Sequence, residues 1–166
     1  NTTGTRNTAI GEQALFSNST ASDNTGLGYR AGYSLATGAE NTFVGASAGD
    51  ANDADANVAI GKGALGSDTR GGRATAVGTG ALSAQNFASA TNNHNVAVGY
   101  IAGAAITTGQ QNTFVGAECG DGTDDGDENT AMGFMALSAN CGDSNTAVGR
   151  QAGLTATGNN NTLLGK

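Results

Sequence analysis

The chain of 166 residues contains no proline and no tryptophan, and its aromatic residues are five phenylalanines and three tyrosines. Leu, Ile, Val and Phe together number only 25, whereas glycine alone numbers 28. A conventional globular core is hard to build from so little apolar area, because apolar burial has to offset the entropy of the chain. The chain is therefore either disordered or arranges its few apolar residues with unusual regularity.

Long apolar runs and clusters of basic residues are also missing. No run approaches the roughly 20 apolar residues of a membrane-spanning helix, and no basic and then apolar signal peptide opens the sequence. The seven Lys and Arg residues stand singly in a chain of net charge −7, so we expect no nucleic-acid partner. Because the sequence opens on asparagine and not on methionine, we expect a processed product or an excised fragment.

The sequence does contain a repeat of 16 or 17 residues, with one interval of 21. Ten copies of a motif similar to Asn-Thr-Ala-Val-Gly begin at Asn7, Asn24, Asn41, Asn57, Ala74, Asn95, Asn112, Asn129, Asn145 and Asn161. The string AsnThrPheValGlyAla occurs at both Asn41 and Asn112, so four repeats form a longer unit of about 71 residues. We expect residues 1–166 to be a single repeat domain.

The motif is nearly uniform among its copies, and its positions are numbered here from 0 at the Asn. Position 1 is Thr in eight copies and Val in two, and position 3 is always apolar. Position 4 is always glycine: Gly11, Gly28, Gly45, Gly61, Gly78, Gly99, Gly116, Gly133, Gly149 and Gly165. Position 7 is Ala in every complete copy except the one that has Cys119.

Short runs of Thr, Val, Ile and Phe bounded by Gly are typical of β-strands, whereas stacked helix pairs need longer repeats. The sequence therefore predicts an all-β parallel β-solenoid, or β-roll, of about ten 16–17-residue coils. Coils about 4.8 Å apart would align equivalent residues in columns along a rod roughly 48 Å long. An Asn column would then bond amide to amide, and a Gly column would permit the positive φ of a tight corner.

Positions 1 and 3 share one face of each strand, position 2 lies on the other, and neither face carries a charge. Strands of this kind are usually buried on both sides. Because a thin coil has only one inside, we expect the second face to pack on another subunit. The Thr column, which would otherwise suit an ice-binding solenoid, shares its face with the always-apolar column and is expected to point inward.

The copies AsnValAlaIleGly from Asn57 and AsnValAlaValGly from Asn95 resemble the head repeats of trimeric autotransporter adhesins and similar repeats of bacteriophage tail fibres. The resemblance covers nearly the whole chain. It implies a left-handed parallel β-roll, a homotrimer around one axis, and attachment to a surface. The repeats are longer here than in autotransporter heads, which fits the fibre relatives better.

Acidic residues gather in one turn, at Asp121, Asp124, Asp125, Asp127 and Glu128. Carboxylates beside glycines suit Ca²⁺, which takes roughly six to eight oxygen ligands, although the spacing matches an EF-hand loop only in part. The alternative is a solvated turn, and no cofactor is required. Cys119 and Cys141 either form a disulfide or stay separate, with Cys119 as a buried thiol in the Ala column.

Residues that vary on the outside of the coils would carry any receptor contact. Tyr29, Tyr100 and Phe134, which follow the motif glycine, could stack on sugar rings or pack at a subunit seam. The longest turn, which holds Phe87 and His94, is the other candidate. His94 is the only histidine, and the carboxylates stand without an aromatic platform, so we expect no enzyme.

These observations predict a structural, adhesive module of an extracellular or virion fibre that attaches to a surface or binds a receptor. We expect its location to be extracellular, on a cell surface or on a virion. Its partners would be copies of itself, as a homotrimer or an end-to-end polymer, and a cell-surface glycan or receptor. The alternative is a subunit of a self-assembling extracellular filament that stacks end to end, and a less favoured alternative is an ice-binding solenoid.

Overall fold

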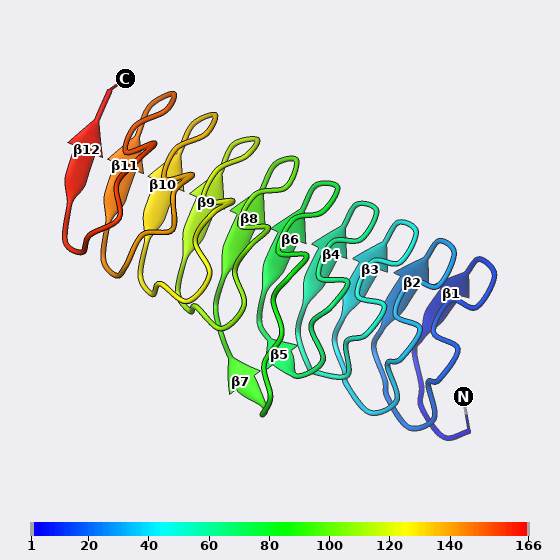
Figure 1. The fold of residues 1–166 in the computed structure, drawn as a ribbon. Helices are drawn as coiled ribbons and strands as arrows, with labels where there is room; N and C mark the ends of the chain where they lie inside the picture. Colours follow the sequence, from blue (N-terminus) through cyan, green and yellow to red (C-terminus); the bar gives the residue numbers. More distant parts are fainter. Residues whose placement is uncertain (1, 166) are drawn as a thin grey trace.

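The computed structural model describes residues 2–165, which form one parallel β-solenoid of about nine turns without a helix among them. Ten three-residue strands stack into a single sheet (Figure 1). They are β1 (Thr8–Ile10), β2 (Thr25–Leu27), β3 (Thr42–Val44), β4 (Val58–Ile60), β6 (Thr75–Val77), β8 (Val96–Val98), β9 (Thr113–Val115), β10 (Thr130–Met132), β11 (Thr146–Val148) and β12 (Thr162–Leu164). A second, two-stranded sheet joins β5 (Gly71–Gly72) to β7 (Thr91–Asn92). The predicted solenoid is confirmed.

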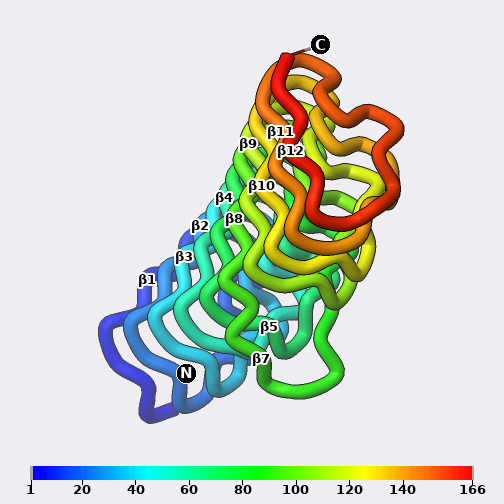
Figure 2. Tube along the Cα trace, turned by 90° about the vertical axis from the view of Figure 1, so that its left-hand side faces the viewer, coloured from blue at the N-terminus to red at the C-terminus, as the bar shows by residue number. Residues whose placement is uncertain are grey.

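Equivalent motif positions lie directly above one another along the whole sheet. Every neighbouring pair is parallel and in the same register, as in Ala59 opposite Ala76. The register holds even across the 21-residue interval, where Thr75 pairs with Val96. The coils therefore share one outline along the axis, and the extra residues of the longest turn project sideways from it (Figure 2).

Each coil turns at corners that need positive φ, and these corners explain which positions vary. The residue just before each motif has φ between 55° and 63°, a left-handed conformation that any residue can adopt at a small cost. From Gly11 to Gly149, position 4 has φ between 125° and 144°, a region open only to glycine. The first corner can therefore hold many residue types, while position 4 is invariant.

The asparagines at position 0, of which seven are buried and two half-buried, brace the coils in two directions. Each carbonyl oxygen accepts the backbone N–H of the next motif, as Asn112 Oδ1 does from Asn129 at 2.9 Å. From Asn7 to Asn145, each amide nitrogen donates to a backbone carbonyl across its own coil, as Asn112 Nδ2 does to Gly126 at 2.8 Å. Direct amide-to-amide bonds also occur, for example from Asn41 to Asn24 at 3.1 Å. Side chain to backbone bonds thus form most of the ladder, and the expected amide-to-amide ladder is only partial.

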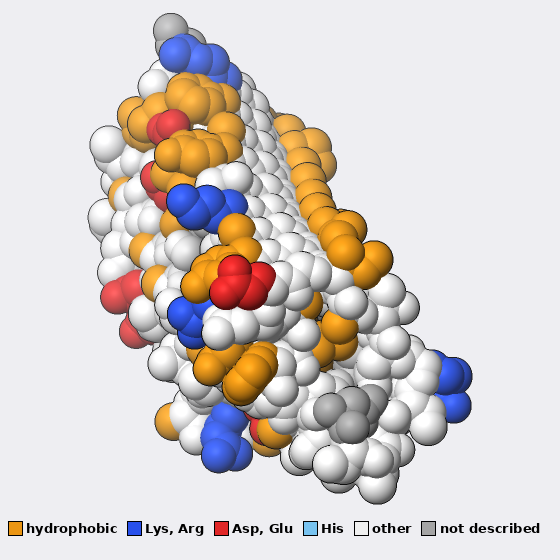
Figure 3. Space-filling model, turned by 90° about the vertical axis from the view of Figure 1, so that its right-hand side faces the viewer, with side chains coloured by type: hydrophobic (Ala, Val, Ile, Leu, Met, Phe, Trp, Pro, Cys, Tyr) orange, Lys and Arg blue, Asp and Glu red, His pale blue; other side chains and the backbone are white. Residues whose placement is uncertain are grey.

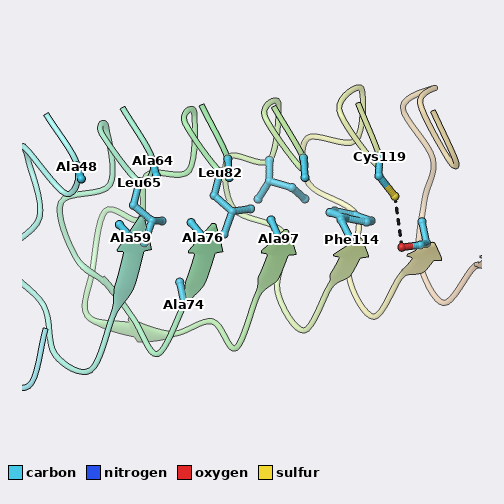
Figure 4. Packing of buried hydrophobic residues seen from close by; sticks show 14 of the residues in the cluster. Ala48, Ala59, Ala64, Leu65, Ala74, Ala76, Leu82, Ala97, Phe114 and Cys119 are labelled. Carbon is cyan, nitrogen blue, oxygen red and sulfur yellow. Dashed lines mark hydrogen bonds between the residues drawn. The ribbon is translucent and has the colours of Figure 1, made fainter. Parts of the chain in front are cut away.

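The core is a narrow space filled mainly by positions 2, 7 and 8 of the repeat, together with Leu35 and Ile106 at position 11. Side chains at position 2 point from the sheet toward the opposite wall of the coil (Figure 4). Most of them are alanine, and the two phenylalanines, Phe43 and Phe114, face glycines. A Cβ placed on Gly49 would lie 2.6 Å from the Phe43 ring, and one on Gly32 would lie 2.8 Å from it. Large and small side chains are therefore matched across the coil.

Candidate functional surfaces

The sheet turns positions 1 and 3 outward, so the expectation that the Thr and apolar columns point inward is wrong. Position 2 is the buried one, and Phe43, Ala59 and Phe114 have no exposed surface. At position 3, seven side chains are between 38% and 75% exposed: Ile10, Leu27, Ile60, Val98, Met132, Val148 and Leu164. Buried leucines at position 8, such as Leu65 and Leu82, already fill much of the space opposite the sheet, so the strands turn their mostly small position 2 side chains inward and their larger position 3 side chains outward.

Positions 1 and 3 of the ten strands form a surface that we term the outer sheet face. None of its residues is charged. Hydrophobic side chains run in rows along the rod (Figure 3). The corner before nine of the ten strands is polar instead: Arg6 pairs with Asp23 of the next coil, and Ser144 Oγ donates to Glu128 at 3.1 Å. An apolar centre bordered by polar residues is the composition of a protein–protein interface.

The predicted aromatic contact residues lie in one exposed column beside this face. Tyr29, Tyr100 and Phe134 are 50%, 56% and 40% exposed, and the Arg150 guanidinium lies 5.8 Å from the Phe134 ring centre. Their role at a sugar or at a subunit seam stays a prediction.

The sequence reasoning missed a second aromatic group, in which Phe16 stacks on Tyr33 with ring centres 5.2 Å apart. Arg30 lies over the Tyr33 ring at 4.4 Å. The signal was present, because Phe16 and Tyr33 occupy the same repeat position of successive coils.

The longest turn projects from the rod as a loop, residues 86–94, which is closed by β5 and β7 (Figure 1). Phe87 is only 4% exposed, so it anchors this loop and does not face a ligand. The prediction of Phe87 as a contact residue is therefore corrected. His94 is exposed at the corner before β8, with φ of 55°, and its role stays a prediction.

Ala74 interrupts the asparagine ladder at the base of this loop, and Asn93 of the loop supplies the missing acceptor. Because alanine has no side-chain acceptor, the N–H of Asn95 donates to Asn93 Oδ1 at 2.9 Å. Asn93 Nδ2 in turn donates to the Gly72 carbonyl at 3.0 Å. The loop therefore contributes a residue, Asn93, to the buried hydrogen-bond network of the coils.

Replacing Asn93 with alanine is expected to cost about 2 kcal/mol of stability, because it leaves the buried Asn95 N–H without a partner, whereas the Gly72 carbonyl still accepts the backbone N–H of residue 93. Urea unfolding followed by circular dichroism measures the loss. The control is Asn92→Ala, since Asn92 is exposed and makes no side-chain hydrogen bond among the described residues. Equal losses for the two variants would contradict the role of Asn93.

Asp68 supports the same loop from inside the coil. It is fully buried, accepts the Gly71 N–H at 2.8 Å, and also accepts from Gln85 and from the Phe87 N–H. Burial raises the pKa of Asp68, and these hydrogen bonds offset the rise only in part. The fold therefore favours the neutral carboxyl.

The stability that Asp68 contributes is full below its unfolded pKa of about 4 and is lost as the pH rises through its raised folded pKa. The melting temperature of the wild type, relative to that of Asp68→Asn, is therefore expected to rise as the pH falls from about 7 to about 4. Differential scanning calorimetry at matched ionic strength measures this difference. A constant difference across that range would show that the Asp68 pKa is not raised.

A concave region of about 270 Å³ lies beside the projecting loop. It is lined by Thr37, Gly38, Asp53, Ala54, Asp55, Arg70, Gly72, Ala90, Thr91 and Asn92. The Asp53 carboxylate is occupied by its own neighbours, because its Oδ1 accepts the N–H groups of Ala36, Thr37 and Gly38 at 2.7–3.0 Å. Asp53 is therefore a structural cap for the preceding coil.

The acidic turn at residues 121–128 does not form a cation cage in the part of the chain that the structure describes. Within residues 2–165, no three His, Cys, Asp or Glu side chains are grouped so that they could hold a metal ion. Asp127 Oδ1 instead accepts the Gln110 N–H at 2.6 Å, and Asn140 Nδ2 donates to Asp124 at 3.1 Å. The calcium prediction for Asp121, Asp124, Asp125, Asp127 and Glu128 gains no support from these contacts.

The carboxyl groups of Asp124 and Asp125 affect each other's protonation. Their interaction lowers the pKa of Asp124 and raises that of Asp125, and the negative charge of Asp124 contributes to the second shift.

The two cysteines are free and buried, so the disulfide that the sequence left open is not formed. Cys119 donates to the Ala131 carbonyl at 3.3 Å, and Cys141 lies 3.2 Å from the Thr123 hydroxyl (Figure 4 shows the first bond). Burial raises the pKa of the Cys119 thiol to about 12, so it stays protonated at neutral pH and unreactive. Cys119 thus fills the alanine column, as the alternative predicted.

Comparisons of the chain with protein-family models, with curated proteins and with solved structures found no match. The resemblance to adhesin and tail-fibre repeats therefore depends on the repeat motif alone. Among the described residues there is no helix long and apolar enough to cross a membrane.

Proposed function

We propose that the chain is a structural module of an extracellular or virion fibre, in which copies assemble side by side through the outer sheet face. The other sides of the coils would then be free for attachment to a surface. One observation supports the proposal most strongly: an apolar column is exposed along the sheet from Ile10 to Leu164, with no charge on its face. The proposed role is mechanical and adhesive and involves no catalysis.

The length of this exposed apolar column indicates that a binding partner covers it. Single exposed hydrophobic side chains are normal on any protein, whereas a continuous apolar row marks an interaction site. The face is also rigid, because the Asn ladder and the in-register strands hold it in place. A rigid face loses little conformational entropy when it is covered, which favours association.

The periodicity of the face favours a second copy of this chain as the partner. Strands in a sheet lie about 4.8 Å apart, so projections and gaps repeat at that interval along the rod. Another copy presents the same interval, and contacts can therefore repeat in step along the full length. A partner without this periodicity would match the face over only a few strands.

Charges placed on the face are expected to separate the copies. The double variant Val77→Glu with Val98→Glu puts two carboxylates at position 3 of neighbouring strands, where packing would bury them without partners. Light scattering after size-exclusion chromatography is expected to give the mass of the single chain, 16.1 kDa. The matched control is Ser67→Glu with Thr108→Glu, at exposed positions off the sheet, which should keep the wild-type mass. An assembled Val77→Glu, Val98→Glu double variant with unchanged melting would contradict the proposal.

Ice binding is a second candidate, because the Thr column faces outward. Eight of the ten strands carry Thr at position 1, in register and beside the apolar column. A flat, rigid array of hydroxyl and methyl groups can order water in a repeating pattern, but it requires an uncovered face. Position 3 mixes Ile, Leu, Val and Met, and this irregular outline suits protein packing better than a lattice. Thermal hysteresis in a monomeric preparation would favour ice binding, and its absence at high concentration would exclude it.

The end-to-end filament remains the alternative mode of assembly. It would use the strand edges of β1 and β12 and leave the outer sheet face uncovered. A mass that grows with concentration without limit, and that the Val77→Glu, Val98→Glu double variant does not change, would support the filament over lateral assembly.

A further inference from the structure

The loop at residues 86–94 is held rigidly over the coils before it. Its backbone pairs with β5, where Gly71 lies opposite Thr91 and Gly72 opposite Asn92. Its aromatic ring, Phe87, is buried, and Asn93 ties its end into the asparagine ladder. The one 21-residue interval of the repeat thus forms a rigid projecting loop, residues 86–94, which we term the overhang. A preorganised surface of this kind binds a ligand at a low entropic cost.

Three polar groups beneath the overhang are free to bind. Asp55 Oδ1 accepts the Ala39 N–H at 2.8 Å, which leaves its Oδ2 without a partner among the described residues. The Arg70 guanidinium and the Asn92 amide likewise have no hydrogen-bond partner within residues 2–165. These side chains come from three successive coils and line one concave region. They offer an anionic acceptor, a fork of cationic donors, and an amide that both donates and accepts.

This combination of groups complements neighbouring hydroxyl groups. A hydroxyl both donates and accepts, so a pair of them can donate to Asp55 and accept from Arg70 or Asn92. The volume of about 270 Å³ lies just below the range of roughly 300–1,000 Å³ typical of ligand pockets, and suits one or two sugar units. The lining contains no aromatic ring, so hydrogen bonds to hydroxyl groups would carry the recognition.

We infer that the concave region beside residues 86–94 binds a saccharide unit of a surface glycan through Asp55, Arg70 and Asn92. This inference rests on the attachment role proposed above and is independent of assembly through the outer sheet face. It assigns recognition to the overhang and not to the exposed aromatic column.

A glycan array probed with the fluorescently labelled chain tests the inference, followed by calorimetric titration of the glycan that binds most strongly. Asp55→Asn and Arg70→Ala are each expected to weaken binding about tenfold, because each removes a charged hydrogen-bonding group. The matched control is Asp127→Asn. Asp127, like Asp55, lies two residues before the next motif asparagine, but in a coil without a projecting loop, and it accepts the Gln110 N–H as Asp55 accepts that of Ala39. The control should bind as the wild type does, and melting temperatures verify that every variant folds.

Binding that falls in both overhang variants and persists in Asp127→Asn supports the inference. An array without any bound glycan would overturn it, and so would equal binding by wild type and Asp55→Asn. A glycan that shifts the NMR signals of Tyr29, Tyr100 and Phe134, and not those of Asp55 and Asn92, would keep the attachment role and refute this location. The mass in solution reports on assembly separately, so the two proposals can fail independently.

Discussion

Alanine in place of Gly61 is expected to destabilise the solenoid by about 4 kcal/mol, from backbone strain and from a clash with the next coil. Gly61 has φ of 132°, and a Cβ there would lie 2.5 Å from both the carbonyl carbon and the oxygen of Gly78. The neighbouring atoms belong to the backbone of a paired coil, so they cannot move aside without separating the strands. Chemical denaturation monitored by circular dichroism measures the loss.

Gly63 is the matched control for this substitution, two residues along the same turn. Its φ is 67°, and a Cβ there would meet nothing within 4 Å. Alanine at Gly63 is expected to cost about 1 kcal/mol, because the left-handed conformation alone opposes it. Similar losses at Gly61 and Gly63 would mean that close stacking of the coils does not restrict position 4.

Removing the Phe43 ring is expected to cost about 4 kcal/mol, since Phe43→Ala leaves a cavity between two glycines in a narrow core. Gly49→Leu alone is expected to cost about 3 kcal/mol, because its side chain would overlap the Phe43 ring. The double variant should recover most of both losses. It recreates the pairing of the next coil, where Ala59 and Leu65 are both fully buried at the equivalent positions.

A double-mutant cycle of unfolding free energies tests this coupling between Phe43 and Gly49. Phe134→Ala serves as a control for loss of a phenylalanine from the surface, because Phe134 is 40% exposed and its removal opens no cavity. Additive losses for Phe43→Ala and Gly49→Leu would contradict the matching of large and small residues across the coil.

The fold could be predicted from the sequence because each repeat of the motif corresponds to one coil of the stack. Nine asparagines and ten glycines at fixed positions are also fixed in space, and the ladder at Asn112 and the corner at Gly61 follow from them. Even the 21-residue interval kept its register, since the extra residues leave the coil as a loop and return before Asn95. Periodicity alone thus identified the strands and their order.

The direction of the strand faces was not predictable from hydrophobicity. The most apolar column was assigned to the inside, but the width of the coil decides which side chains fit there. A signal for this width was in the sequence: glycine occurs at position 8 in each coil with phenylalanine at position 2, as in Phe43 with Gly49 and Phe114 with Gly120. That pairing marks position 2 as the one that faces the opposite wall.

The sequence predicted where the candidate binding site lies, at the longest turn, but not which residues line it. The longest turn was recognised as a candidate, yet Phe87 proved to be its anchor. The polar lining comes from Asp55 and Arg70, which belong to two earlier coils and approach Asn92 only through stacking. Contacts between coils depend on which loops project and in what direction, and the spacing of motifs does not specify this.

The mass of the chain in dilute solution tests the central proposal, that copies of the chain cover the outer sheet face. Sedimentation equilibrium over a range of concentrations is expected to give a constant mass of about 48 kDa, three times the 16.1 kDa of one chain. A mass of 16.1 kDa that persists at high concentration would contradict the account, because the apolar column from Ile10 to Leu164 would then remain exposed to water.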